Sequence, residues 1–362
     1  MTELARLFRH ASLPQELVPY DRAAETIKHT NRRLHEGVAN SKIRNKLQSG
    51  VEVLQEMMNA VASQPDEWVN GIRVRRKVTA YSRRHIMARL SAARSSYMYL
   101  PNIFRQSLGR KLLRDFDFVK SFQRVAVGLL MMIPDVDMED FSALVAYSND
   151  DANELLGCIV AYYGFYCRPK ECAKVMLQVA FFHGCLSANA RAISGFQGLP
   201  MPELEALREQ CLRARDAILA MPCFADAIPK LHKSVRRQKP GRTEEQYLRS
   251  VFSHILGGVE GHCLSVACQV LEEHGFAPRT YIYDGANTTD SSTHSPQEAC
   301  DAADAAVLAK TGIRMTLREK PMFDCNELNL YADTLEALVE SVRPDAECGD
   351  PANPANPAVS VA

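Results

Sequence analysis

The chain has 362 residues, of which 46% are hydrophobic, 24% charged and 7% aromatic, and 43 basic side chains balance 43 acidic ones. This composition excludes a largely disordered chain, and the length suffices for one large or two ordinary domains. No run of about 18 uninterrupted apolar residues occurs, so we expect no membrane span. The N-terminal MTELARLFRH lacks a signal-peptide core, and none of the 11 cysteines is spaced as CxxC. We therefore expect a reducing location, cytoplasmic or nuclear, rather than secretion.

Hydrophobic periodicity predicts a helical N-terminal region. Residues 20–65 carry an apolar stripe close to a 3.6-residue period, and residues 80–96 continue in the same style. Pro101 disfavours a helical residue before it, so we expect a break near 97–101. Residues 1–96 are therefore predicted to form one helical, basic region.

Charge is balanced overall but not locally. Between Trp68 and Arg114 there is no Asp or Glu, whereas the same 47 residues contain 12 Lys or Arg. A long basic stretch without carboxylates is typical of segments that bind a phosphate backbone. The alternative is a solvated face whose cations pair with acids elsewhere in the fold. The residues that we expect to contact nucleic acid are Arg75, Arg76, Arg83, Arg84, Arg110 and Lys111.

The middle of the chain predicts a short strand followed by helices. The segment RDFDFVKSFQRVAVGLLMMIP changes from a strand at Phe116–Val119 to a buried helix over 121–133, which Pro134 ends. Further helices are expected near 140–165, 169–183 and 201–221, and a second basic cluster covers 230–242.

The region after Thr243 carries the clearest signals. A helix over 244–275 ends at a glycine, and RTYIYDGANTTD predicts a hairpin with Asp284-Gly285 at its turn. A further helix over 295–310 precedes a last strand, which the alternation of apolar residues over 313–317 predicts. Helices with a few separated strands indicate an α+β fold.

Two aspartates stand where a sheet would present a side chain at its edge. Asp117 ends the short strand, and Asp284 lies at the tip of the hairpin. Phosphoryl transfer needs Mg²⁺ held by carboxylates, together with cations on the departing phosphates. Lys170 and Lys174, one helical turn apart, could hold a triphosphate. Each signal alone has a plainer interpretation: a common DG turn, a surface DxD, or a solvated lysine face.

The order of these segments resembles motifs A, B and C of family A DNA polymerases, and more closely the compact family-A-like polymerases of giant viruses and mobile elements. The first motif corresponds to Asp117 and the six residues after it. The second runs from Lys170 through Lys174 to His183-Gly184, and the third is YIYDG, which contains Asp284.

Two further segments agree with this resemblance, which spans about 97–322. Arg249 fits the R-x3-N-x4-G segment before the third motif, and TGIRMTLREKPM fits the closing strand with its Lys-Pro. The chain departs from the family pattern at Lys120, Phe122, His183 and Gly285, the last of which leaves the third motif without its second acid.

The resemblance implies a DNA polymerase of right-hand architecture that extends a DNA primer-template from dNTPs. Asp117 and Asp284 would hold two Mg²⁺ ions, and Lys174 would neutralise the leaving pyrophosphate as a third catalytic residue. The residues implied to bind the substrate are Lys170, Phe122, His183 and Arg249.

The implied division of the chain has five parts. They are a helical thumb-like region over 1–96, palm with motif A over 97–135, helical fingers over 136–242, palm with motif C over 243–330, and an acidic, Pro/Ala-rich tail over 331–362. The palm is expected to hold a small antiparallel sheet.

Two other interpretations remain. One is a non-catalytic nucleic-acid-binding module with a degenerate palm, which the departures at positions 120 and 122 favour. The other is a helical scaffold or virion protein whose basic face meets an acidic partner. The sequence leaves open whether the template is DNA or RNA and whether a helicase or primase partner takes part.

Overall fold

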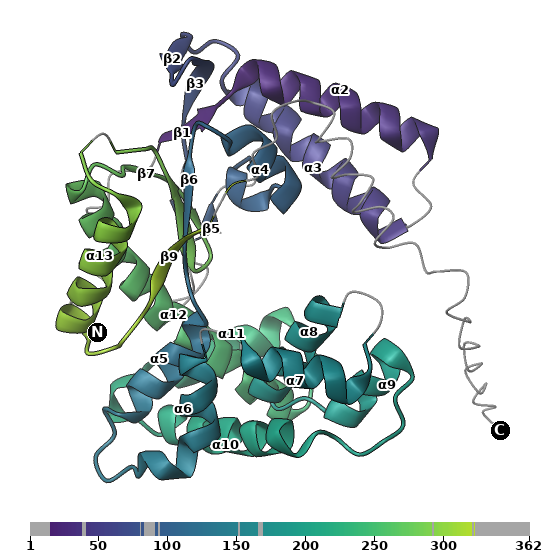
Figure 1. Cartoon of the computed structure of the whole chain (residues 1–362), viewed down its shortest axis with the longest axis vertical. Coiled ribbons are helices and arrows are strands. Elements are labelled where there is room, and N and C mark those ends of the chain that lie inside the picture. The colour runs from purple at the N-terminus through teal and green to yellow at the C-terminus, as the bar shows by residue number, and fades with distance from the viewer. Residues whose placement is uncertain are drawn as a thin grey trace.

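The computed structural model describes residues 15–37, 41–79, 81–82, 91–92, 95–150, 153–165, 169–291, 293–320 and 322. Its fold is α+β, with many helices and small antiparallel sheets, as the sequence predicts. Figure 1 shows an N-terminal unit at the top, a sheet in the middle and a helical unit below. The N-terminal unit has its own hydrophobic core, whereas the sheet and the helical unit share a second, larger one.

The N-terminal unit combines two long helices with short strands. Its elements are β1 (Gln15–Val18), α2 (Tyr20–Glu36), α3 (Ser41–Ala60), β2 (Glu67–Val69), β3 (Ile72–Val78), β4 (Tyr81–Ser82), β5 (Ser91–Ala92), the 3₁₀ turn η1 (Tyr97–Tyr99) and α4 (Asn102–Gly109). The strands β1, β3 and β2 form one antiparallel sheet.

The prediction that residues 1–96 are helical is therefore wrong for the basic strand β3 and its neighbours. Asn70 and Gly71 both have positive φ, at 52° and 73°, and they join β2 to β3 in a two-residue hairpin. The β-branched residues Ile72, Val74 and Val78 favour the strand that follows.

The central sheet has four antiparallel strands in the order β7-β8-β6-β9. They are β6 (Arg114–Phe118), β7 (Pro278–Ile282), β8 (Gly285–Thr288) and β9 (Leu317–Lys320). β6 lies between β8 and β9, although these strands are far from it in the sequence. The alternating apolar pattern predicted a last strand from residue 313, whereas β9 begins only at Leu317.

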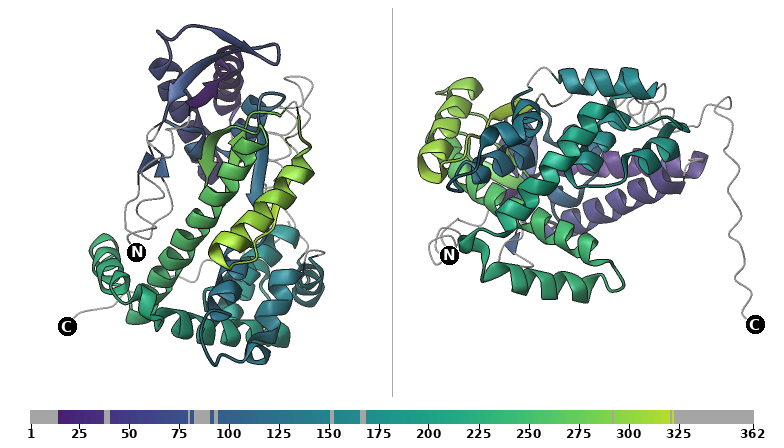
Figure 2. Two further views of the ribbon diagram at one scale, coloured as in Figure 1. Left: turned by 90° about the vertical axis from the view of Figure 1, so that its left-hand side faces the viewer. Right: turned by 90° about the horizontal axis from the view of Figure 1, so that it is seen from below.

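One face of this sheet packs against helices of the larger core, whereas the N-terminal unit lies on the other face. Phe116, Phe118, Ala286 and Leu317 share the first of these faces and belong to the larger core. α12 (Glu244–Glu273) and α13 (Pro296–Thr311) contribute residues to the same core. Figure 2 shows these two helices side by side. Because side chains alternate along a strand, the residues between these apolar positions point to the opposite face.

Local signals place α12 and α13 as predicted. Capping boxes begin both helices, at Thr243 and at Ser295, and Gly312 ends α13 with φ at +71°. α12 is long and apolar enough to span a membrane by composition, but most of that stretch is buried inside the protein, as is usual for core helices.

The helical unit follows β6. It comprises α5 (Ser121–Leu130), η2 (Met138–Phe141), α6 (Ser142–Asn149), α7 (Glu154–Tyr163), α8 (Pro169–Phe181), α9 (Leu186–Ser194), α10 (Pro202–Leu219), η3 (Pro222–Phe224) and α11 (Ala227–Gln238). The bounds of α5, α6, α7, α8 and α10 agree with the predicted helices, whereas α9 and α11 were not predicted.

A buried glutamate of the N-terminal unit pairs with a lysine of the same unit and also accepts a hydrogen bond from the central sheet. The side chain of Glu16 has no exposed surface, and its Oε2 lies 3.7 Å from Nζ of Lys77. Ser96 donates a hydrogen bond of 2.5 Å to Oε1 of Glu16, and Thr280 of β7 donates another of 3.4 Å. Burial raises the pKa of Glu16, an effect that Ser96 and Lys77 oppose.

Candidate active site

Asp117 and Asp284, 167 residues apart in the chain, lie on neighbouring segments at one end of the central sheet. Asp117 is the penultimate residue of β6 and is paired with Gly285 of β8. Tyr283, with φ at +52°, and Asp284 form the turn between β7 and β8. The backbone N–H of Phe118 donates a hydrogen bond of 3.1 Å to the carbonyl oxygen of Asp284. The turn thus begins one residue earlier than the predicted Asp284-Gly285.

Further polar residues lie on the face of the sheet opposite to its apolar core face. Asp115 and Asp117 are two residues apart on β6 and therefore point to the same side. Asn287 of β8 is opposite Asp115 and donates a hydrogen bond of 2.9 Å to its carboxylate. Lys320 of β9 is also opposite Asp115. The sequence suggested no more than a surface DxD here, whereas the structure shows an acidic face, which Asp115, Asp117 and Asp284 define.

Burial and neighbouring charges both act on this acidic face. The pKa of Asp115 is raised, chiefly because burial disfavours its charged form. Lys320, Arg105 of α4 and the Asn287 hydrogen bond lower it, while the negative charge of Asp284 raises it. Arg105 thus places α4 on the polar side of the sheet, opposite to its apolar core face, as Figure 1 also shows.

Cations and hydroxyls contact the two aspartates directly. Nζ of Lys320 forms an ion pair with Oδ2 of Asp117. The Lys320 side chain is 56% exposed, whereas that of Asp117 is only 15% exposed. The hydroxyl of Ser121, at the start of α5, donates a hydrogen bond of 3.4 Å to Oδ2 of Asp284.

Gly285 explains why the site has no acid after Asp284. A Cβ atom at this position would lie 2.3 Å from the carbonyl oxygen of Phe116 and 2.9 Å from Oδ1 of Asp117. Any side chain here would therefore push β6 and β8 apart. The close approach of the two strands brings the backbone of Asp284 beside Asp117.

The predicted lysines are on another element. Lys170 and Lys174 are both exposed on α8. Within the described ranges, neither ammonium forms an ion pair with a carboxylate. Figure 1 shows α8 at the upper surface of the helical unit, on the side of the sheet opposite to α13. Phe122 of α5 packs edge to face against Phe182, with ring centroids 5.9 Å apart, and so joins the segment after Asp117 to the end of α8.

His183 is buried just after α8, and Arg249 lies near it on the first turns of α12. His183 is 5% exposed, and burial together with the charge of Arg215 lowers its pKa to about 4. Arg249 is half-buried and donates a hydrogen bond of 3.4 Å to Glu245, which also pairs with Arg215. The structure does not bring His183 to a surface where a substrate could touch it.

Lys120, where the family pattern has Asn, serves as a tether. It has φ at +49°, and its Nζ donates a hydrogen bond of 3.0 Å to the carbonyl oxygen of Tyr147. The same ammonium lies 3.5 Å from Oδ2 of Asp150. Lys120 therefore fastens the turn after Asp117 to the end of α6.

Two of the predicted nucleic-acid contacts pair with acids of the same unit. Arg75 pairs with Asp66 and lies over the ring of Tyr20, and Arg76 pairs with Glu67 at 2.8 Å. These pairs fit the alternative interpretation for β3, and contact of its arginines with nucleic acid stays a prediction. Arg110 is half-buried and its carbonyl accepts a hydrogen bond of 2.6 Å from Arg22, Lys111 is exposed, and Arg83 and Arg84 lie outside the described residues.

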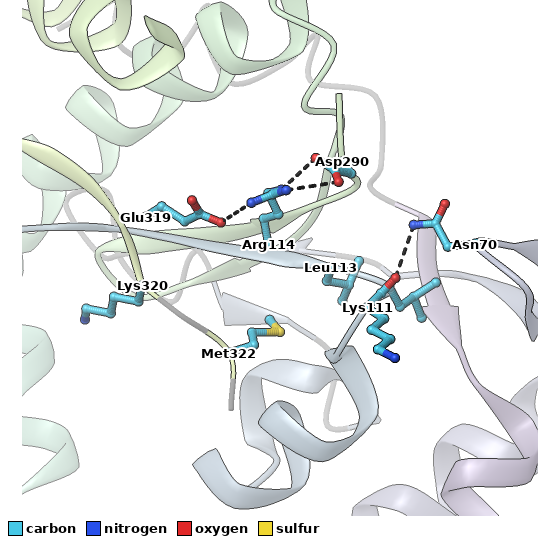
Figure 3. A pocket seen from close by; sticks show the side chains of 9 residues that line it. Asn70, Lys111, Leu113, Arg114, Asp290, Glu319, Lys320 and Met322 are labelled. Carbon is cyan, nitrogen blue, oxygen red and sulfur yellow. Dashed lines mark hydrogen bonds and ion pairs between the residues drawn. The ribbon is translucent and has the colours of Figure 1, made fainter. Parts of the chain in front are cut away.

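Lys111 and Lys320 line the same pocket, which has a volume of about 270 Å³. Figure 3 shows Arg114 on one side of β6, where it contacts Asp290 and Glu319, while Lys111 and Lys320 extend to the other side. Arg114 is neutralised by these two acids. Lys111 and Lys320 thus lie on the side of β6 opposite to the neutralised Arg114.

No known protein family matches the chain, and no curated protein is similar to it. Among solved structures, it is similar to the POL domain of Pol1 from M. smegmatis, in complex with DNA primer-template and dNTP. The two are 14% identical with a TM-score of 0.45, and the match covers 76% of this chain and 51% of that one. The chain thus spans about half the length of that structure.

The donor atoms at the acidic face fit Mg²⁺ but form a sparse set. The described residues contain no group of three or more His, Cys, Asp or Glu arranged to hold a metal ion. Mg²⁺ accepts oxygen ligands, keeps several waters, and is commonly bound by one or two carboxylates together with substrate phosphates. Asp117 and Asp284 supply that number, and Lys320 shows that the position beside Asp117 accepts a cation.

Several residues of the site escaped the sequence analysis. Lys320, Arg105 and Asn287 belong to three different elements, and only strand pairing or packing brings them to Asp115. Lys320 is the lysine of the Lys-Pro that the resemblance includes, but it was given no role at the site. Its partner could not be predicted, because β9 pairs with a strand about 200 residues earlier.

Proposed function

We propose that this chain is a template-dependent nucleotidyltransferase that extends a primed DNA strand from dNTPs. One observation carries the proposal: Asp117 and Asp284, from distant parts of the chain, meet at the end of a small antiparallel sheet, on the side opposite to its apolar core face. Two carboxylates in this position are the ligands that metal-assisted phosphoryl transfer needs.

The proposed roles follow from charge and position. Asp117 and Asp284 hold two Mg²⁺ ions, which would polarise the phosphate and stabilise the attacking and leaving oxygens. Ser121 orients Asp284, and Lys120 fixes the turn that follows Asp117. Burial against the sheet holds both carboxylates in place, so little reorganisation is needed during the reaction.

The exposed face of α8 supplies the cations of the proposal. Lys174 neutralises the charge that develops on the leaving pyrophosphate and donates a proton to it, and Lys170 contacts the triphosphate. Phe122, held against Phe182, flanks the sugar. A right-hand arrangement, with α5 to α11 as fingers, the central sheet as palm and the N-terminal unit as thumb, is part of the same proposal.

Primer extension tests the two aspartates directly. Asp117→Asn and Asp284→Asn remove one negative charge each without changing side-chain size, and each should abolish Mg²⁺-dependent extension of a primed template. Asp226→Asn, at an exposed position on the helical unit, is the matched control and should extend normally. Circular dichroism and thermal melting would show that the folded state persists. Unchanged extension by either active-site variant would refute the assignment.

One observation favours a second candidate, a non-catalytic nucleic-acid-binding protein. The ammonium of Lys320 occupies the position beside Asp117 that a metal ion would need. If this lysine replaces the metal permanently, the protein binds DNA in a salt-dependent manner but performs no synthesis. DNA binding at low salt without any Mg²⁺-dependent extension would support this candidate, and absence of DNA binding would point instead to a scaffold.

A further inference from the structure

Lys320 is the cation closest to the proposed metal ligands. It belongs to the edge strand β9, opposite Asp115, and reaches diagonally to Oδ2 of Asp117. Asp117, Asp115 and Asp284 crowd negative charge on one face, and like charges at such separations repel each other. An ammonium ion beside Asp117 reduces that repulsion when no divalent ion is bound.

The surroundings of Lys320 allow it to leave. More than half of its side chain is exposed, whereas Asp117 is mostly buried. The lysine also lines the 270 Å³ pocket between β6, β9 and the segment around Lys111, so its side chain has room to move without disturbing the core (Figure 3). A lysine is a flexible point charge with four methylene groups, and an ion pair whose lysine is largely exposed is weaker than a fully buried pair.

We propose that Lys320 is a displaceable placeholder, whose ammonium holds Asp117 in the metal-free protein and is displaced when a divalent cation binds. This inference rests on the proposed function, because it takes Asp117 as a metal ligand. Lys320 is then a positioning residue: it keeps the two strands and the carboxylate in place before the metal arrives, and it lowers the affinity of the empty site for the ion.

Metal binding measured without DNA or dNTP tests the proposal. Mn²⁺, followed by electron paramagnetic resonance, serves as the probe. Lys320→Met removes the competing charge and should tighten Mn²⁺ binding roughly fivefold, as expected for the loss of one exposed ion pair. Lys320→Arg keeps the charge and should show no such gain. Lys310→Met, an exposed lysine on α13, is the matched control for the change in net charge and should bind Mn²⁺ like the wild type.

Thermal melting in EDTA gives a second readout that does not depend on activity. Lys320→Met should melt at a lower temperature than the wild type in EDTA, because the carboxylates then repel without compensation. Added Mg²⁺ should raise its melting temperature by more than it raises that of the wild type. Lys320→Gln, which keeps a polar end group, would repeat both measurements if the Met variant proved poorly soluble.

The outcomes separate this inference from the proposed function. Unchanged Mn²⁺ affinity in Lys320→Met, with binding lost in Asp117→Asn, overturns the placeholder role and leaves the polymerase proposal standing. No Mn²⁺ binding by either the wild type or Lys320→Met overturns both, because the acidic face would then hold no divalent cation even without the competing lysine. Tighter binding in Lys320→Met alone supports the inference.

Discussion

The basic strand β3 and the acidic strand β6 both carry charged residues in series, but their charges are compensated differently. Arg73, Arg75 and Arg76 of β3 face acids that lie within its own unit, at Asp21, Asp66 and Glu67. Asp115 and Asp117 of β6 are joined by a third acid, Asp284, and meet cations from β9 and α4. β3 is therefore locally neutral, whereas the end of β6 gathers three carboxylates on one face of the sheet.

This difference shows that the distribution of charge along a chain does not determine the electric field around the folded protein. The 47-residue stretch without acids begins immediately after Asp66 and Glu67, and the hairpin folds β3 back against the strand that contains Glu67. The acidic face, in contrast, assembles from segments that lie 167 residues apart. In both regions, strand pairing determines which charged side chains become neighbours.

The largest effect should come from the one cation of β3 that is buried. Lys77→Met leaves Glu16 without a counter-ion in a site with no exposed surface, which should cost about 3–5 kcal/mol in unfolding free energy. Arg76→Met, which breaks an exposed pair on the same strand, should cost less than about 1 kcal/mol. Urea denaturation at pH 7 measures both.

Two further measurements make the Lys77 prediction specific to the ion pair. The double variant Glu16→Gln with Lys77→Met removes both charges and should recover much of the lost stability. The deficit of Lys77→Met should also shrink at low pH, where Glu16 takes up a proton. Equal losses in Lys77→Met and Arg76→Met would contradict the distinction between buried and exposed pairs.

His183 provides the opposite case to Lys77, a basic group that burial keeps neutral. Its pKa of about 4 lies below the ordinary 6.5, so between these values the unfolded chain binds a proton that the folded chain does not. Stability attributable to His183 should therefore be complete above pH 6.5 and fall by about 3 kcal/mol as the pH drops to 4. Urea denaturation over this range measures the slope.

His183→Asn should flatten that part of the pH dependence. Asparagine does not titrate, and it tolerates the positive φ of 58° at this position. His35→Asn, at an exposed position on α2, is the control and should keep the slope of the wild type. A wild-type slope in His183→Asn would mean that other groups cause the loss of stability in acid.

The elements that the sequence predicted correctly have local signals. The change from strand to helix after Asp117, the capping boxes of α12 and α13, and the glycine after α13 each depend on residues within a few positions, and the structure contains all of these features. The Asn70-Gly71 pair was an equally local signal for a hairpin that was missed. This pair lies inside the basic stretch, whose charge predicted nucleic-acid binding but not a strand.

The residues that could not be predicted depend on pairing between distant segments. Lys320 reaches Asp117 only because β9 pairs with the free edge of β6. Arg105 reaches Asp115 only because α4 packs on the polar side of the sheet. No periodicity or spacing encodes those neighbours. The same reasoning applies to the acids that neutralise β3, because Asp21 comes from α2.

The smallest predicted effect tests whether ion pairs with acids keep the arginines of β3 from contacting DNA. If the proposed function is correct, Lys111→Gln should reduce the slope of log affinity against log salt concentration by about 1, because one phosphate contact is lost. Arg76→Gln should leave that slope unchanged, because Glu67 already compensates the guanidinium. Fluorescence anisotropy with a labelled primer-template at several salt concentrations measures both slopes. If the two variants lost the same amount, the arginines of β3 would leave their acids for the phosphate backbone, and the acid-free stretch would have indicated nucleic-acid binding after all.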